Sequence, residues 1–274
     1  MFSAPMVRAL LAGTKTQTRR TVKGAPAFVM SFIGRDNLPT GEFGMQWTHE
    51  RVINAHARCP YGVVGDRLWV KEAHRFEEWN EHGRAQVTYV ADGALRRDVF
   101  VDVRDYDQWS DQRASQWTRA GAERLKYDEE VGDNVDATDD DDGEDCWLQM
   151  PAGKKPPVSV SIHMPRWASR ITLEVIGVRV ERLQSITEAD AVAEGLDALS
   201  KDGGQTIKYG IADLDGLPGN DDVGWHWRDW HGDPRVAYRK LWERINGTGS
   251  WALKSWAANP WVFVVDFAVA EVRR

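Results

Sequence analysis

The stretch LLAGTKTQTRR, residues 10–20, joins a short apolar run to a purely basic segment. The first five charges of the chain, from Arg8 to Lys23, are all positive, although the whole chain has a formal net charge of −7. The preceding PMVRALLAG, residues 5–13, predicts a short helix, since proline favours a helix start and Gly13 favours its end. We expect an extended segment over residues 16–22.

The composition is that of a globular protein. The chain has 274 residues, 42% of them hydrophobic and 28% charged, enough for one large domain or two small ones. No apolar run is long enough to span a membrane, and the basic start lacks the apolar region of a signal peptide. Cys59 and Cys146 lie too far apart to suggest a disulfide framework. We therefore expect a cytoplasmic protein with no membrane partner.

Acidic residues are concentrated in one segment. DNVDATDDDDGED, residues 133–145, holds eight acids and no base, and without it the formal net charge changes from −7 to +1. Such a run predicts a solvated loop, because like charges repel and no apolar period survives. The remainder is nearly neutral with a basic start, so nucleic acid remains an open partner class.

The helix predicted at 186–196 carries the clearest local signal. Thr187 stands in the N-cap position, Asp190 three residues later completes a capping box, and Gly195 lies near the end. A second helix is predicted at 234–247. One face of that helix collects four apolar or aromatic side chains: Tyr238, Leu241, Trp242 and Ile245.

The strand patterns are short. A Gly-rich loop is expected around 34–44. The sequence predicts a strand in the second part of 65–76 and a hairpin formed by 85–91 and 98–105. It also predicts one or two strands within 168–186 and a closing strand at 259–272, which is too apolar to be exposed on both sides. Short strands with few helices predict an α+β fold built on a small β-barrel, one domain over 1–274, with insertions at about 77–157 and 197–233.

The order of these motifs resembles the ASCH domain family of the PUA-like barrels. The matching blocks are LLAGTKTQTRR, GDRLWV, ITLEVIGVRVERLQSITEADAVAEGL and NPWVFVVDF, which cover less than half of the chain. Lys15, Thr16, Thr18 and Arg20 match the family's Lys-Thr-x-Thr-x-Arg pattern. CPYGVVGDRLWVKEAHRF and IHMPRWASRITLEV are similar to long ASCH proteins of bacteriophages and prophages.

The resemblance implies a barrel with a cleft for a nucleotide or RNA. Small bacterial enzymes of the family hydrolyse the amide of N4-acetylcytidine to cytidine and acetate. Carried onto this sequence, their base is Lys15, their threonine nucleophile is Thr18 and their proton-donating glutamate is Glu194. The resemblance therefore implies an amidohydrolase acting on N4-acylated cytosine nucleosides or nucleotides.

This chemistry sets conditions that the structure can test. A threonine hydroxyl attacks only when a base takes its proton, and lysine is a base only when its pKa falls through burial or nearby positive charge. Arg19 and Arg20 supply such charge. Lys15 and Thr18 would point to opposite faces of a regular strand, so catalysis by the triad requires a turn at 14–18 and fails without it.

Other residues are candidates for substrate binding. Thr16, Arg19 and Arg20 belong to the opening motif. His163, Arg166 and Trp167 in SIHMPRWASR combine cations with an aromatic ring and could hold a phosphate and a base, or equally form a basic loop that packs its tryptophan. Fourteen tryptophans occur, seven of them between Trp225 and Trp261, and these are expected to fill a core or to stack on bases.

Several functional classes find no support. His49, His56 and Cys59 lack the paired spacing of metal ligands, so no metal is expected. No phosphate-loop, dinucleotide, serine-esterase or zinc-protease motif occurs, and no cofactor is implied. Two alternatives to the amidohydrolase stay open: a non-catalytic module of phage origin that binds RNA or a modified nucleotide, and a ribonuclease of the ASCH type.

Overall fold

The computed structural model describes residues 2–23, 28–33, 39–46, 55–80, 84–100, 147–149, 158–219, 224–247 and 254–273. Apart from the two terminal residues, the chain forms two compact units. We call residues 71–169 the hairpin unit and residues 2–70 with 170–273 the strand–helix unit, and each is described by itself.

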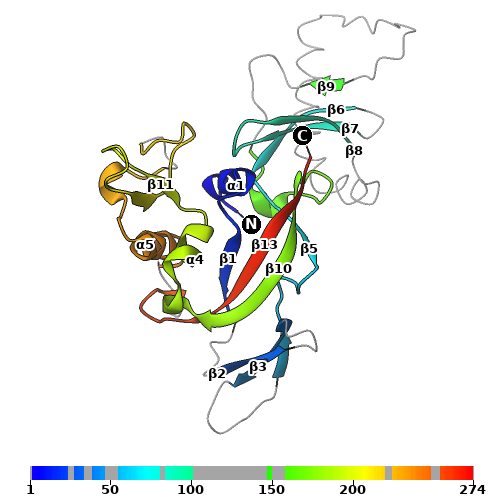
Figure 1. Cartoon of the computed structure of the whole chain (residues 1–274). Helices are drawn as coiled ribbons and strands as arrows, with labels where there is room; N and C mark the ends of the chain where they lie inside the picture. The colour runs from blue at the N-terminus through cyan, green and yellow to red at the C-terminus, as the bar shows by residue number, and fades with distance from the viewer. Residues whose placement is uncertain are drawn as a thin grey trace, which may run out of the picture. The chain divides into compact units, whose positions relative to one another are not determined.

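The strand–helix unit is built on a four-stranded antiparallel sheet (Figure 1). Its order is β1 (Gln17–Thr21), β13 (Trp261–Val272), β10 (Ile171–Arg182) and β5 (Arg67–Trp69). The pair β10–β13 runs 12 residues on each side, as the dense β-branched runs of both segments favour. The predicted extended segment and closing strand are confirmed, but only the first half of β13 is buried on both faces.

A register irregularity in β10 shapes one position of this sheet. The pairing between β10 and β13 shifts between Val175 and Gly177, and Gly177 faces Asp266. A Cβ at residue 177 would lie 2.9 Å from the Asp266 carboxylate. The glycine therefore leaves room for a charged side chain within the apolar first half of β13.

Three α-helices are described in the strand–helix unit: α1 (Ala4–Leu11), α4 (Glu188–Ala193) and α5 (Pro234–Asn246). The predicted capping box is present, since Thr187 Oγ1 accepts from the Asp190 N–H and Asp190 Oδ2 accepts from the Thr187 N–H. On α5, Tyr238 and Trp242 are buried as predicted, whereas Ile245 is 65% exposed because the last turn extends beyond the core.

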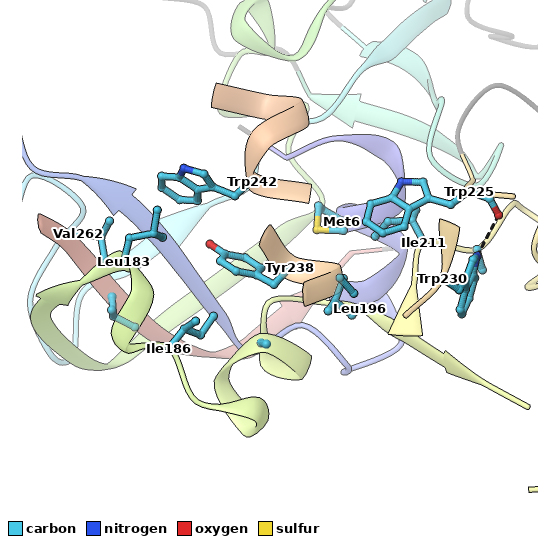
Figure 2. Packing of buried hydrophobic residues seen from close by; sticks show 14 residues of the cluster. Met6, Leu183, Ile186, Leu196, Ile211, Trp225, Trp230, Tyr238, Trp242 and Val262 are labelled. Carbon is cyan, nitrogen blue, oxygen red and sulfur yellow. Dashed lines mark hydrogen bonds between the residues drawn. The ribbon is translucent and has the colours of Figure 1, made fainter. Parts of the chain in front are cut away.

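Tryptophan fills the core between the sheet and the helices (Figure 2). Trp225 and Trp230 are both about 2% exposed, and the Trp230 indole N–H donates to the Trp225 carbonyl at 2.9 Å. They lie beside the short pair β11 (Asp197–Leu199) and β12 (Lys208–Gly210). Trp225 and Trp230 therefore fill the core, which is one of the two roles expected for the tryptophans of this region.

A separate three-stranded sheet occupies the region in which a Gly-rich loop was expected around 34–44. It contains β2 (Phe28–Ile33), β3 (Pro39–Gln46) and β4 (Ala55–Arg58), in that order. The loop prediction is wrong for 39–44, because Gly41 and Gly44 lie within β3, and Gly44 pairs with a residue of each neighbouring strand. Residues 34–38 lie outside the described part.

The hairpin unit contains a second four-stranded sheet. Its order is β8 (Leu95–Phe100), β7 (Arg84–Tyr89), β6 (His74–Asn80) and β9 (Trp147–Gln149). The predicted hairpin is confirmed, but its second strand begins at Leu95 rather than 98, because Gly93 takes a left-handed φ of 72° in a tight turn. Residues 101–105 and the acidic run 133–145 lie outside the described residues.

The architecture agrees with an α+β or mostly β class, with few helices and several antiparallel sheets. Among the described strands, none of the four sheets closes into a barrel. Within the described residues, no helix has both the length and the apolar character needed to cross a bilayer. The arrangement as one domain with two insertions stays a prediction.

Gly210→Ala tests the packing of the tryptophan core. A Cβ at residue 210 would lie 2.4 Å from Trp230 Cδ2, a contact that the buried ring cannot relieve by rotating into solvent. We expect a loss of about 1–3 kcal/mol in the free energy of unfolding, measured by urea denaturation. Gly232→Ala is the matched control, because a Cβ there has 3.9 Å to its nearest neighbour. Equal stability of the two variants would contradict this packing.

Candidate functional site

Lys15 and Glu194 meet at the free edge of β1. The two residues form an isolated antiparallel bridge, and the Thr16 N–H donates to the Ala193 carbonyl at 2.9 Å. The close approach depends on Gly195, which ends α4 with φ 95° and whose missing Cβ would lie 3.0 Å from Lys15 Cβ. The helix signal read from the sequence thus brings Glu194 to the lysine of the opening motif.

The Lys15 ammonium is enclosed by three oxygen atoms. Nζ donates to the Gln17 carbonyl at 2.7 Å, to the Glu194 carbonyl at 2.7 Å and to Glu194 Oε2 at 3.1 Å. Lys15 is 3% exposed and Glu194 4%. Burial lowers the pKa of Lys15 below its usual 10.5; Glu194 opposes this shift, and the charges of Arg20 and Arg19 add to it. A lowered lysine pKa is the condition that the sequence analysis set for a base.

The expected turn at 14–18 is not formed. The chain turns earlier, at Ala12 and Gly13, where Gly13 has φ 74°. Lys15 already lies in its bridge with Glu194, and β1 begins at Gln17. Pairing with both neighbours holds this segment extended, so any contact between Lys15 and Thr18 has to come from the length of the lysine side chain.

Thr18 lies on the other face of β1 from Gln17 and Arg19. It pairs with Val265, while Arg20 pairs with Phe263, and cross-strand partners share a face. The aromatic ring of Phe2 packs edge-on against Phe267, which alternation along β13 also places on this face.

The same ring connects the Thr18 face with the lysine. The Phe2 centroid lies 5.6 Å from Lys15 Nζ and 5.7 Å from Arg20 Cζ. The ammonium at the edge of β1 is therefore next to an aromatic ring that packs on the face carrying Thr18. The structure brings Lys15 and Glu194 into direct contact and places Thr18 around the strand edge from them.

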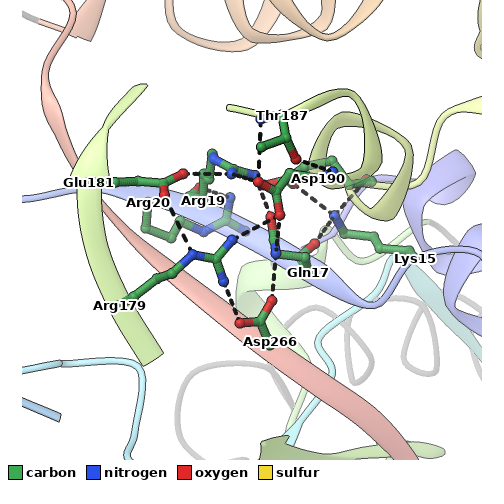
Figure 3. Close-up of polar contacts among 10 residues, drawn as sticks. Lys15, Gln17, Arg19, Arg20, Arg179, Glu181, Thr187, Asp190 and Asp266 are labelled. Carbon is green, nitrogen blue, oxygen red and sulfur yellow. Dashed lines mark hydrogen bonds and ion pairs between the residues drawn. The ribbon is translucent and has the colours of Figure 1, made fainter. Parts of the chain in front are cut away.

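Arg19 is the centre of a buried charge network (Figure 3). Its guanidinium is fully buried and forms ion pairs with Glu181 at 2.7 Å, Asp190 at 3.3 Å and Glu194 at 3.3 Å. These carboxylates come from β10, α4 and the C-cap of α4. Binding a substrate phosphate, as expected of Arg19, would require breaking these pairs.

Gln17 and Arg179 extend the network to β13. The Gln17 amide N–H₂ donates to Asp190 and Asp266, and its carbonyl oxygen accepts from Arg19. Arg179 donates to Asp190 at 2.8 Å and to Asp266 at 2.5 Å. With Lys15, the network joins three cations to four carboxylates, and these carboxylates come from β10, α4, the C-cap of α4 and β13.

Sequence reasoning missed Gln17, Arg179, Glu181 and Asp266. A signal for Asp266 was present, since a lone carboxylate inside the apolar VFVVDF is expected to have a buried partner. Arg179 and Glu181 alternate along β10 and therefore share a face. Nothing in the sequence, however, showed that these residues meet the opening motif.

The other predicted substrate-binding residues divide between the two units. In the strand–helix unit, Thr16 is exposed and Arg20 is half-buried. In the hairpin unit, His163 and Arg166 are exposed next to η1 (Ser161–His163), and Trp167 packs its ring 5.3 Å from Phe76. Trp167 is half-buried in this packing, and base stacking on it stays a prediction.

Two further observations limit where a functional site can lie and what it can hold. Among the described residues, no group of three metal-ligating side chains gathers. A shallow depression of about 300 Å³ lies between α5, Gln184 and Trp256, and none of the predicted site residues lines it. The charge network at the β1 edge is therefore the feature that coincides with the predicted site.

Comparison of this chain with family models, with curated proteins and with solved structures gives no match. The site is consequently interpreted from its own geometry.

Asp190→Asn tests the network through acid stability. Burial alone would raise the pKa of Asp190, but hydrogen bonds from Gln17 and Thr187 and the charges of Arg19 and Arg179 lower it to about 2, below its usual 3.8. A carboxyl with a depressed folded-state pKa stabilises the fold above pH 3.8 and loses that contribution as the pH falls towards 2. We expect wild type to lose about 1–2 kcal/mol over this window, after allowance for solvent screening, and the variant to lose less.

The measurement is urea denaturation between pH 6 and pH 2.5. Glu188→Gln, an exposed acid on the same helix, serves as control and should keep the wild-type pH dependence. A variant Asp190→Asn that loses as much stability as wild type would contradict the network.

Proposed function

We propose that this chain is an amidohydrolase acting on N4-acylated cytosine nucleosides or nucleotides, on an ASCH-type, PUA-like fold. The observation that supports this proposal is the contact between Lys15 and Glu194, 179 residues apart in sequence. These are the two residues to which the resemblance assigns the base and the proton donor. Their types and their contact suit proton transfer.

The hydrogen bonds around Lys15 define what the pair can do. Two carbonyl oxygens accept two of its N–H groups, and the third direction points at Glu194 Oε2. A single proton can therefore be exchanged between the amine and the carboxylate while the two carbonyl bonds persist. A base that accepts a proton and an acid that returns it are what amide cleavage requires.

Because no turn brings Thr18 to Lys15, the proposed reaction requires the Lys15 side chain to leave one of its oxygen partners and reach around the strand edge. It then takes the proton of the Thr18 hydroxyl, and the hydroxyl oxygen attacks the acyl carbon. The bond between that carbon and N4 breaks, Glu194 protonates the departing amine, and the acyl group rests on Thr18 as an ester. Water then cleaves the ester and releases the carboxylic acid. The Phe2 ring and Arg20, on the Thr18 face, are the groups available to contact the base and an anionic substituent.

A second candidate function is binding of a nucleotide or RNA at the same edge without turnover. The enclosure of Lys15 and Glu194 favours it, since both are nearly inaccessible and saturate each other. Isothermal titration with N4-acetylcytidine, together with chromatography of the mixture, separates the two functions. Binding without formation of cytidine would select the second.

Lys15→Gln and Glu194→Gln test the proposed pair. Each removes the proton-transfer group but retains hydrogen-bonding capacity, and we expect kcat for release of cytidine from N4-acetylcytidine to fall at least about 100-fold. Because Lys15 carries the lowered pKa, the wild-type rate should rise with pH through a midpoint below 10.5. Lys15→Gln should abolish that rise.

The matched control is Arg239→Gln, an exposed charge on α5, which should retain wild-type turnover. Thermal melting is measured for every variant, because removing one member of a buried ion pair destabilises the fold. Folded Lys15→Gln or Glu194→Gln protein with wild-type turnover would refute the proposal.

Thr18→Val tests the nucleophile. The substitution removes the hydroxyl at nearly constant volume, so we expect loss of turnover with little change in melting temperature, and partial activity in Thr18→Ser. Mass spectrometry after acid quench should detect an acyl adduct on wild type and none on Thr18→Val. Full turnover by Thr18→Val would assign the attack to water instead.

A further inference from the structure

A cationic and aromatic surface lies on the segment between β12 and α5. Trp227 begins η3 (Trp227–Asp229) and is half-buried, with its ring 5.6 Å from the ring of Trp230. Lys201 Nζ lies 4.8 Å and Lys208 Nζ 5.0 Å from the Trp227 centroid. Two ammonium groups, one from the loop after β11 and one from the start of β12, thus lie over one partly exposed indole.

Cations from α5 gather at the neighbouring tryptophan. Lys240 Nζ lies 5.5 Å and Arg244 Cζ 5.2 Å from the ring of Trp225. Trp225 is buried and has no face for a ligand, so its role is to hold these cations. We call Lys201, Lys208, Trp227, Lys240 and Arg244 the Trp227 surface.

The Trp227 surface has an excess of positive charge. Asp229 is occupied by Lys240, and Asp202 accepts from Ser200 and Thr206 within its own loop. Within the described part of the chain, Lys201, Lys208 and Arg244 form no ion pair with a carboxylate. Three cations are therefore held over indole rings instead of carboxylates.

The backbone beneath Trp227 is held on both sides. The Trp225 N–H donates to the Ile211 carbonyl at 2.8 Å, and Tyr209 and His231 exchange two backbone hydrogen bonds. Gly210 lets the Trp230 ring lie against β12, as described above. The backbone that carries Trp227 is therefore held on both sides, and its ring packs against Trp230, which lowers the entropic cost of binding a ligand on it.

We infer that the Trp227 surface binds single-stranded nucleic acid, with phosphates on Lys201, Lys208 and Arg244 and a base stacked on Trp227. Proteins that bind single strands combine such a cationic track with an aromatic platform. Lys201 is exposed and Lys208 half-buried, and lysine side chains have several rotatable bonds, so both ammonium groups can turn from the ring to phosphates when a base replaces them. The inference does not depend on the proposed amide hydrolysis, whose residues lie at the β1 edge.

The test measures binding of labelled oligonucleotides of about fifteen nucleotides, oligo(U) and oligo(dT), to the full chain by fluorescence anisotropy. Lys201→Ala/Lys208→Ala should weaken binding at least about tenfold and make the slope of log affinity against log salt shallower by about 1.4, for two phosphate contacts. Trp227→Leu should weaken binding with an unchanged salt slope, because it removes stacking and no charge.

The matched control is Arg235→Ala/Arg239→Ala, which also removes two exposed cations but from the first turns of α5. It should bind like wild type. Circular dichroism confirms that each variant is folded. Comparison of the two oligonucleotides shows whether RNA or DNA is preferred, and either preference supports the inference.

Three results would overturn the inference: no binding by wild type, an equal loss in the control variant, or competition by polyglutamate as strong as by unlabelled oligonucleotide. The oligonucleotides carry no acyl group, so a lack of oligonucleotide binding would leave the amidohydrolase proposal unaffected. A lack of amide hydrolysis would likewise leave the proposed nucleic-acid binding unaffected.

Discussion

The burial of Lys15 and Arg19 among carboxylates is the constraint on which the strand–helix unit depends. A charge taken out of water is stable only when it is paired and hydrogen-bonded, so each carboxylate partner has to be delivered by the fold. Glu181 comes from β10, and Asp190 and Glu194 from α4. The network therefore ties α4 to the edge of the sheet through polar contacts, in addition to the apolar core.

The same constraint gives the site its chemical character. Lys15 has a lowered pKa because it is buried and because Arg19 and Arg20 lie nearby, while Glu194 acts in the opposite direction. A lowered pKa makes Lys15 a better proton acceptor near neutral pH than an exposed lysine. The structural role of the pair and the proposed catalytic role are compatible, since the same enclosure underlies both.

The two proposed ligand sites use aromatic rings differently. At the β1 edge, the Phe2 ring lies beside two cations, Lys15 and Arg20. At the Trp227 surface, the indole is held on the tryptophan core and is partly exposed, with the ammonium groups of Lys201 and Lys208 over it. The abundance of tryptophan in 197–233 thus serves two purposes: a buried pair forms the core, and a third ring on that core remains accessible.

Local patterns in the sequence by themselves determined the helices, the extended segment of the opening motif and the closing strand. The capping box of Thr187 and Asp190, the glycine after α1 and the apolar run of β13 all act through neighbours in sequence, so they could be read without coordinates. Only the tertiary structure decided that Lys15 reaches Glu194 along a strand edge, without a turn. It alone showed that Gln17, Arg179 and Asp266 complete the network, because pairing between distant strands depends on register and on which charges burial forces together.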